Sequence, residues 1–460
     1  MSSTLDESAA RPSSDEAVLG LGSDLPQTES VPLPCEETHE NEPRNFVWLA
    51  LHQVLMRVGW VFKTESIVMP FFMDAIGGDA TLRGSLMVFN RLGFSVPPAL
   101  FARSLKLMPQ KRWAVCLSTF GMAIPFAVLS IVWASGVWRD ANGEPAGWMP
   151  YFFLAAYAVF FTLTGLNQLA IHSIGGKLIR PQRRGRLFAA GVFVGAPIAI
   201  AAAWWLMPQW LRLPDGGFTW LFAAPAVCFA LASVTMLAVR EKGDDFQEES
   251  TPAWRRLWDA STLAFAPGPY RRVAIVALLF SATFTLFPHY QALARELAEA
   301  SGGAAFDTSS LMVWTVTQHL AVAVLSLFTG PMADRLGNRA AVRFCVIGAA
   351  LAPLTAAALG WLAPEVSAGW FWIVFLPLGF TPVTIKMLIN YTLELAPREE
   401  HPRYVSAVGM CLAWPVIIGS PLVGALVGVI GCAPVFALGA VVILAAGAQT
   451  LLLAEPRHAG

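Results

Sequence analysis

Charged residues are scarce in this 460-residue chain, since Asp, Glu, Lys and Arg together make up only 13% of it. An ordinary soluble domain carries roughly 25%. Hydrophobic residues make up 56% of the chain, which excludes a soluble globular protein and indicates an integral membrane protein. Cysteine is scarce too, and the six cysteines form no CxxC pair and no cluster with histidine. We therefore expect them to be small core residues, with no disulfide and no metal site.

Motifs of membrane enzymes are also missing. The sequence contains no GxSxG, no HExxH, no phosphate-cradling loop of the Walker type, and no paired carboxylates within its apolar runs. These absences argue against an enzyme. We expect neither a cofactor nor a nucleic-acid partner.

The N-terminal segment 1–44 differs from the rest of the chain in charge. It holds ten acidic and two basic residues, whereas the remaining residues hold 21 acidic and 29 basic ones. The segment is rich in Ser, Pro and Glu and offers little to bury, so we expect a disordered acidic tail. Because it begins acidic and polar, it does not resemble a signal peptide.

Long apolar runs dominate the rest of the sequence, and about 20 apolar residues are enough to cross a membrane. Twelve runs are expected to be transmembrane helices: Phe46–Phe72, Leu82–Phe101, Trp113–Val137, Tyr151–Ile174, Leu187–Met207, Phe218–Val239, Val273–Leu293, Ser310–Phe328, Ala341–Leu362, Trp370–Tyr391, Tyr404–Ile430 and Ala433–Leu453. The longest internal connection follows the sixth run. The sequence therefore predicts an all-α integral membrane protein with two six-helix bundles.

These two bundles comprise residues 45–240 and 271–455, and residues 456–460 form a C-terminal tail. The linker 241–270 contains tryptophans and leucines beside two arginines in its stretch 252–265. An amphipathic helix on the inner leaflet and an ordinary flexible linker both fit this stretch.

Basic residues indicate which connections lie in the cytoplasm. One set of connections holds 21 Lys and Arg residues, and the other set holds four: Arg83, Arg139, Arg212 and Arg295. Both termini are therefore expected in the cytoplasm. Arginine outnumbers lysine by 25 to six and alanine is abundant, which resembles a bacterial protein from a GC-rich genome. We expect a multi-pass protein of the inner (cytoplasmic) membrane that works as a monomer in the lipid bilayer.

A weak internal repeat relates the two bundles, as is common in transporter folds. A shift of 218 residues aligns five pairs in corresponding runs: Pro70 with Pro288, Gln168 with Lys386, His172 with Asn390, Gly191 with Gly409 and Pro197 with Pro415. Five matches at one shift indicate two halves with one pattern.

The connection between the eighth and ninth runs holds the sharpest motif, formed by Gly330, Asp334, Arg335, Gly337 and Arg339. Together with the twelve runs and the repeat, it resembles the cytoplasmic motif of the major facilitator superfamily, and the resemblance covers residues 45–455 by architecture. The resemblance implies a transporter whose halves rock about a central site. It also implies that the aspartate braces the halves when the cytoplasmic side is closed, with the start of the fifth run near Arg186 as partner.

The corresponding connection in the first half keeps its basic residues but lacks the aspartate and the glycines. The antiporters of the family tend to have a glycine-rich motif with Gly-Pro in the fifth run. Here the match is partial, because alanine separates Gly195 from Pro197.

Five Lys, Arg and Glu side chains lie deep inside the apolar runs, away from their ends, namely Arg57, Lys63, Glu65, Arg91 and Lys386. Each costs on the order of 2.5 to 3.5 kcal/mol in a bilayer, so such groups usually face a cavity. The resemblance implies that runs 1, 4, 7 and 10 line that cavity. The candidate lining residues are Arg57, Glu65, Asn167, Gln168, His172, His289, Tyr290, Lys386 and Asn390.

Two interpretations of these charges remain open. In the first, Arg57, Arg91 and Lys386 bind or steer an organic anion, because arginine offers a rigid fork to a carboxylate or phosphate. In the second, Arg91 forms a structural ion pair with Glu65. Lys63 either faces the cavity or faces a neighbouring helix or the membrane surface.

Glu65 is also the first candidate for proton coupling. A carboxylate that alternates between an apolar setting and the neighbourhood of a cation binds and releases a proton. His172 and His289 are substitutes for this role, although a lone histidine in a span is more often a packing residue. The sequence thus predicts a secondary active transporter that carries a small organic anion and is coupled to protons. A drug or metabolite exporter and a transporter-like receptor or assembly protein are the alternatives.

Overall fold

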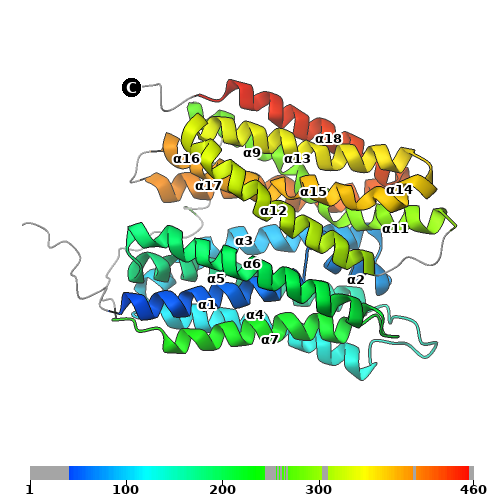
Figure 1. Cartoon of the computed structure of the whole chain (residues 1–460), viewed down its shortest axis with the longest axis horizontal. Coiled ribbons are helices and arrows are strands. Elements are labelled where there is room, and N and C mark those ends of the chain that lie inside the picture. Colours follow the sequence, from blue (N-terminus) through cyan, green and yellow to red (C-terminus); the bar gives the residue numbers. More distant parts are fainter. Residues whose placement is uncertain are drawn as a thin grey trace, which may run out of the picture.

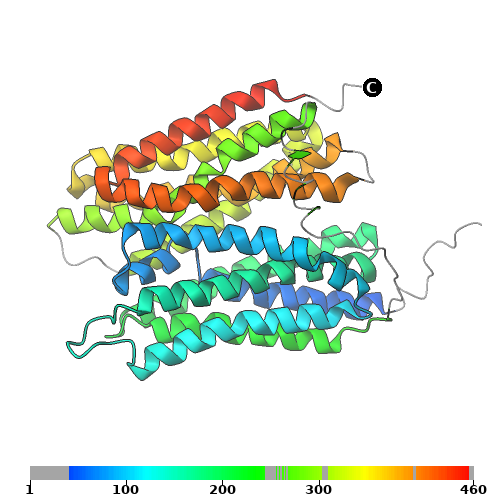
Figure 2. The same cartoon turned by 180° about the vertical axis from the view of Figure 1, so that it is seen from behind.

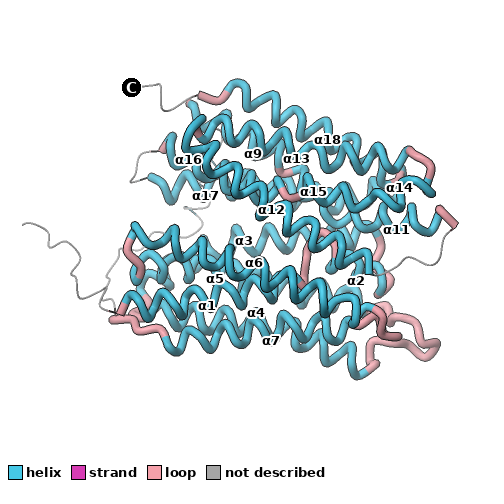
Figure 3. Tube along the Cα trace, viewed as in Figure 1, coloured by secondary structure: helices cyan, strands magenta, loops and turns pink. Residues whose placement is uncertain are grey.

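Helices form the whole framework of the computed structural model, and they lie side by side along one direction (Figure 1). The structure describes residues 41–243, 268–302, 309–396 and 400–454, with five single residues between 255 and 265. Loops join the helices at both ends of the bundle (Figure 3). The chain enters the first helix and leaves the last one at the same end, which we call the terminal end; the other is the distal end.

The N-terminal half contains seven α-helices and a 3-10 turn. They are α1 (Glu42–Val61), α2 (Val68–Ala75), α3 (Ala80–Leu107), α4 (Lys111–Ser135), α5 (Met149–Leu178), α6 (Pro181–Leu211), α7 (Phe218–Thr235) and η2 (Met236–Ala238).

The C-terminal half repeats this plan with more interruptions. Its elements are α9 (Pro269–Phe280), α10 (Ala282–Leu286), η3 (Phe287–His289), α11 (Tyr290–Ala300), α12 (Ser309–Leu336), α13 (Asn338–Trp361), α14 (Pro364–Trp370), η4 (Phe371–Val374), α15 (Phe375–Leu378), α16 (Phe380–Leu395), α17 (His401–Ile430), α18 (Cys432–Gln449) and η6 (Thr450–Leu452).

Ten helical segments of the described chain are long and apolar enough to cross a membrane. They correspond to the third through twelfth expected runs. The first two runs, α1 with α2 and α3, are helical but are not among the ten, so the all-helical membrane fold is confirmed and the count of twelve only in part. Both carry charges that lower their hydropathy, such as Arg57 in α1 and Arg91 in α3.

The boundaries differ slightly from the expected ones. Residues 42–44, placed in the tail by the sequence, form the first turn of α1, and Glu42 is buried against the arginines that precede α6. The predicted amphipathic helix of the linker lies largely outside the described residues.

The first span of each half is interrupted. Residues 62–67, between α1 and α2, are not helical, and in the second half Ser281 separates α9 from α10. A shift of 218 residues places this serine opposite Lys63, so the two breaks correspond. Non-helical backbone at membrane depth is tolerated where it is buried in protein or lines a cavity, and broken helices often mark binding sites in transporters.

The two halves meet mainly through two pairs of helices, α3 with α17 and α6 with α12. Figure 2 shows α3 and α17 side by side across the junction. Gly84 and Gly424 allow this contact near the distal end. A Cβ atom on Gly424 would collide with the backbone carbonyl of Ala80, and one on Gly84 would lie 2.5 Å from the carbonyl oxygen of Ser420.

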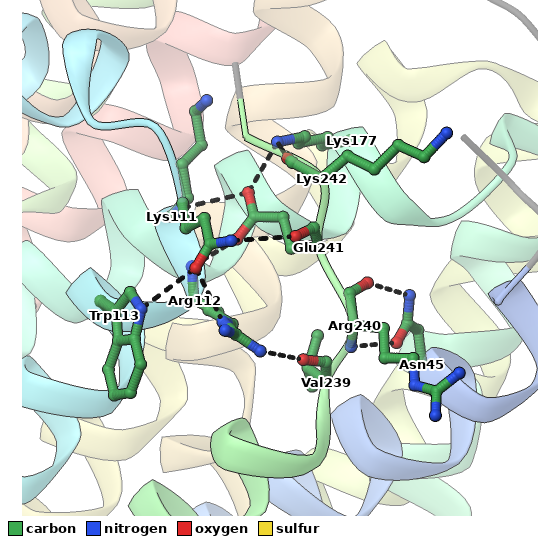
Figure 4. Close-up of polar contacts among 10 residues, drawn as sticks. Asn45, Lys111, Arg112, Trp113, Lys177, Val239, Arg240, Glu241 and Lys242 are labelled. Atoms are coloured by element: carbon green, nitrogen blue, oxygen red, sulfur yellow. Dashed lines mark hydrogen bonds and ion pairs between the residues drawn. The ribbon is translucent and has the colours of Figure 1, made fainter. Parts of the chain in front are cut away.

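Glu241 ties the terminal end of the N-terminal half together (Figure 4). Its carboxylate accepts hydrogen bonds from the backbone N–H groups of Lys111 (3.0 Å) and Arg112 (2.8 Å), at the start of α4. Lys177, at the end of α5, donates to the same carboxylate at 2.8 Å. An anion at a helix N-terminus satisfies unpaired N–H groups and the helix dipole, so one side chain after the sixth span fastens α4, α5 and the start of the linker.

Candidate functional site

Glu65 lies in the break between α1 and α2 and has two polar partners. Lys63 Nζ lies 2.6 Å from Glu65 Oε1, and the amide of Asn90 in α3 donates to Glu65 Oε2. The Lys63 ammonium is fully buried and lies 3.3 Å from the ring centroid of Trp60, with Phe160 and Phe161 within 5 Å. A cation over aromatic faces is stabilised by the ring quadrupole.

Lys63 is therefore the ion-pair partner of Glu65, and the structural pair considered for Arg91 and Glu65 does not form. The Arg91 guanidinium lies instead 3.6 Å from the ring centroid of Phe284, in α10 of the other half. Its Nε atom is buried without a hydrogen-bond partner. The charge of Glu65 still acts on Arg91 at longer range, so Arg91 contributes to the contact between the halves.

Arg57 lies in α1, on the terminal side of the break. It makes no hydrogen bond or ion pair with any described residue and is half-buried. Lys386 of α16 is near enough for its charge to interact with that of Arg57, and so is His319 of α12. The Nδ1 atom of His319 is 2.9 Å from the backbone carbonyl of Thr315. Three basic side chains from both halves thus converge on one region.

Two glycines of α6 pack closely against α1 beside Arg57. A Cβ atom on Gly195 would lie 3.2 Å from Arg57 Cδ and 3.3 Å from Val54 Cα. A Cβ on Gly191 would meet the side-chain oxygen of Gln53 at 2.5 Å. The small residues of the fifth span therefore let α6 approach α1 closely at the level of Arg57.

Other expected lining residues fall into two groups. Gln168 and His172 of α5 and Asn390 of α16 are exposed, like Lys386. Asn167 is buried instead, because its amide donates to Thr119 Oγ1 at 2.6 Å and to Ser118 Oγ at 3.2 Å, inside the N-terminal half. Tyr290 is buried at the distal end, where it stacks on Phe436.

A cluster of buried polar residues joins the halves at the distal end; we call it the distal lock. It consists of Asp74, Arg83, His289, Gln291 and Arg295. Arg83 pairs with Asp74 at 2.6 Å within the N-terminal half. From the C-terminal half, Gln291 donates to Asp74 at 2.7 Å and Arg295 lies 3.3 Å from it.

His289 completes the lock, since its Nδ1 accepts from Arg83 Nε at 3.4 Å. Closer to the middle, Ser66 donates to Gln318 of α12 at 2.6 Å, again between the halves. These contacts show that the halves are held together at the distal end.

The predicted gating motif occupies the junction of α12 and α13. Gly337 has φ of 89°, a conformation that glycine adopts without strain, and it starts α13. Gly330, Asp334 and Arg335 belong to the end of α12, so Gly330 lies within a helix and makes no turn. Arg339 donates to the carbonyl of Leu453 at 3.4 Å.

The expected partner of the motif is the start of α6. Arg186 is exposed in the second turn of α6. Its brace with Asp334 stays a prediction.

Sequence reasoning missed most of the distal lock. It placed Arg83 and Arg295 in connections and gave Asp74 no role. One feature of the sequence could have indicated it. Asp74 and Arg295 carry opposite charges, and each lies just after the first span of its half. His319 and Gln318 had no signal, because the family resemblance does not place the eighth span at the cavity.

Solved structures of membrane transporters share this fold. Nucleoside transporter NupG matches with a TM-score of 0.65 and 12% identity, over 89% of this chain and 98% of that one. A POT family transporter in complex with 5-aminolevulinic acid matches with a TM-score of 0.66 and 14% identity, over 91% and 97%. A bacterial homologue of the iron transporter ferroportin, in an inward-facing state, gives 0.59 and 13%, over 89% and 98%. No curated protein matches the sequence.

The ten apolar helices and this fold thus define a multi-pass membrane protein with the architecture of these solved transporters. The family model described as Major Facilitator Superfamily matches residues 292–460. The matched residues lie in the C-terminal half, and the solved transporters show that both halves share their fold.

Proposed function

We propose that the protein is a secondary active transporter of a small organic anion, working by alternating access. The observation that carries the proposal is Arg57, a guanidinium inside the bundle with no ion-pair partner among the described residues, beside the positive charge of Lys386. The solved neighbours are described with unlike solutes, namely nucleosides, 5-aminolevulinic acid and iron. The solute class is therefore argued from the residues of this chain.

An unpaired charge within a membrane protein is expensive. The cost is on the order of 2.5 to 3.5 kcal/mol for an arginine at the centre of a span, and like charges nearby add to it. A bound anion removes this cost by supplying the opposite charge. A carboxylate or phosphate group accepts two parallel hydrogen bonds from a guanidinium, so Arg57 is the proposed anchor of the solute, with Lys386 as an additional donor.

Proton coupling is the second part of the proposal, and Glu65 is its centre. The carboxylate is held by Lys63 and Asn90 in the non-helical segment 62–67. Protonation of Glu65 would cancel its attraction to the buried Lys63 ammonium and free the segment to rearrange. Because Ser66 in the same segment binds Gln318 of the other half, a proton on Glu65 can alter the contact between the halves.

Orientation follows from the distribution of basic residues, which favours the terminal end as the cytoplasmic one. In this orientation the structure has its extracytoplasmic end held closed by the distal lock. A proton-driven exporter is the second candidate for the direction of transport. The close packing of Gly191 and Gly195 against α1 favours it, since antiporters of the family carry a glycine-rich fifth span.

The test begins with a thermal-shift screen of organic anions on the purified protein, followed by counterflow of any hit in proteoliposomes. Arg57→Gln should abolish the shift and the counterflow. Arg212→Gln is the matched control, because Arg212 is exposed at the end of α6 and should leave both intact. An Arg57→Gln variant that folds normally and exchanges the solute at the normal rate refutes the anion site.

Coupling is tested separately in the same vesicles under an imposed pH gradient. Glu65→Gln should exchange solute but no longer accumulate it in response to the gradient. If the variant still accumulates solute as the native protein does, Glu65 is not the coupling group.

A further inference from the structure

His289 has an unusual set of partners in the distal lock. Its Nδ1 atom lies 3.4 Å from both Nε and Nη2 of Arg83, and its Nε2 atom is buried without a partner. A guanidinium has five N–H donors and no acceptor. Nδ1 must therefore carry a lone pair, and the ring is neutral with its hydrogen on Nε2.

The charges around His289 are already balanced. Arg83 of α3 and Arg295 of α11 face Asp74 of α2, and Glu296 of α11 interacts electrostatically with all three. Two guanidinium groups and two carboxylates therefore offset one another. Of the neighbouring groups, Glu299 pairs with Arg295 from an exposed position, and Tyr290 and Gln291 carry no charge.

A proton on His289 would disturb this balance. The ring is fully buried, and a new N–H at Nδ1 would point at the guanidinium of Arg83. Like charges in contact and a lost hydrogen bond would both oppose the closed arrangement. The Asp74 carboxylate already contacts three donor groups, those of Arg83, Gln291 and Arg295. It is therefore not available to pair with a protonated His289.

We propose that His289 is a proton-binding site distinct from Glu65, and that only the state with the distal end open holds this proton. The histidine and Arg83 belong to different halves, so opening separates them and exposes Nδ1. A proton arriving from the distal side then keeps the lock from closing. The inference rests on the proposed alternating access, and it adds the side from which the proton enters.

The size of the effect follows from linkage. A ligand that binds one of two states shifts the balance toward that state by its differential affinity. An imidazole in water titrates near pH 6.5. If the closed state excludes the proton, lowering the pH from about 8 to about 5 should raise the ratio of open to closed molecules by about 30-fold.

The experiment measures the opening itself, without solute. Cysteines are introduced at Ala141 and Ala363, which are exposed in distal connections of the two halves, and Cys35 is replaced by serine. Nitroxide labels at the two positions report their separation by pulsed electron paramagnetic resonance in lipid nanodiscs. Mass spectrometry checks that only these two sites carry labels.

The native sequence should gain a long-distance population at low pH. His289→Gln should show no gain, because a glutamine carbonyl still accepts from Arg83 but does not titrate in this range. His289→Lys, with a fixed charge, should populate the long distance at both pH values. His401→Gln, at the terminal start of α17, is the matched control and should respond like the native protein.

Two results would overturn the proposal: no change in the native protein between the two pH values, or a normal response in His289→Gln. Loss of the response in Glu65→Gln together with its persistence in His289→Gln would assign the proton to Glu65 instead. Arg57→Gln should keep the full response. Failure of the anion site and failure of the histidine site are therefore separate outcomes.

Discussion

Replacement of Asp74 by asparagine is the most direct test of the distal lock. The side chain accepts from Arg83 in its own half and from Gln291 and Arg295 in the other half. Asparagine removes the charge, and one of its two terminal atoms becomes a donor facing other donors. Arg83 and Asp74 belong to the same half, so we expect the change to act through the two contacts that cross between the halves.

The magnitude follows from these two contacts. A hydrogen bond to a charged group contributes about 1.5 to 3 kcal/mol. The Arg295 side chain is 28% exposed, so the low end of the range applies to its pair with Asp74. The closed state should lose about 3 kcal/mol relative to the open one, which corresponds to a population shift of roughly 150-fold.

The assay is the separation of labels at Ala141→Cys and Ala363→Cys in nanodiscs at neutral pH. Asp74→Asn should move most molecules to the long distance and slow transport that requires the distal end to close. Asp79→Asn is the control, since Asp79 accepts from the N–H of Leu82 at 2.7 Å and caps α3 on the same side. An unchanged distance distribution in Asp74→Asn would refute the role of the lock.

Three further predictions concern packing and buried charge. Gly424→Ala should also favour the open distal end, because its Cβ collides with the backbone of α3, whereas Gly428→Ala, with open space around it, should leave the label distances unchanged. Lys63→Met should lower the free energy of unfolding by about 3 to 5 kcal/mol, because it removes the ion-pair partner of Glu65. The double variant with Glu65→Gln should recover most of this loss. If the effects of the two substitutions simply add, the pairing is contradicted. Glu241→Gln should lower the melting midpoint by an amount equivalent to about 1 to 3 kcal/mol, measured by thermal unfolding in detergent, and an unchanged midpoint would contradict the role of this carboxylate.

Much of the fold was predictable from the sequence because membrane crossing constrains composition strongly. The apolar runs located the helices, and the resemblance to the major facilitator superfamily agrees with the family model that matches residues 292–460. The repeat gains support from a feature that the sequence does not display, the corresponding breaks at Lys63 and Ser281. The boundary at residue 45 was three residues late, because Glu42 is polar in sequence but is buried in the structure beside Arg180, just before α6, and Arg183, in its first turn.

The site was predicted less well, for two physical reasons. Arg57 and Glu65 were expected on one transmembrane helix spanning Phe46–Phe72, and side-chain positions follow the helical period only while the helix is continuous. The helix ends at Val61, so Lys63 turns to Glu65 and into an aromatic cage. The distal lock was missed because charges near span ends are ordinarily solvated, and only the approach of the second half buries Asp74 and Arg83.

The interruption at residues 62–67 gives the first span a joint. Its inner rod, α1, is fixed to the N-terminal half through Glu42 and Asn45, while its outer rod, α2, carries Asp74 of the distal lock. In the proposed cycle the solute sits on the inner rod at Arg57 and the proton on Glu65 sits in the joint. In that cycle both ligands act on the angle between α1 and α2. The first span can then change direction at residues 62–67, and one end of the protein can open without bending a continuous helix.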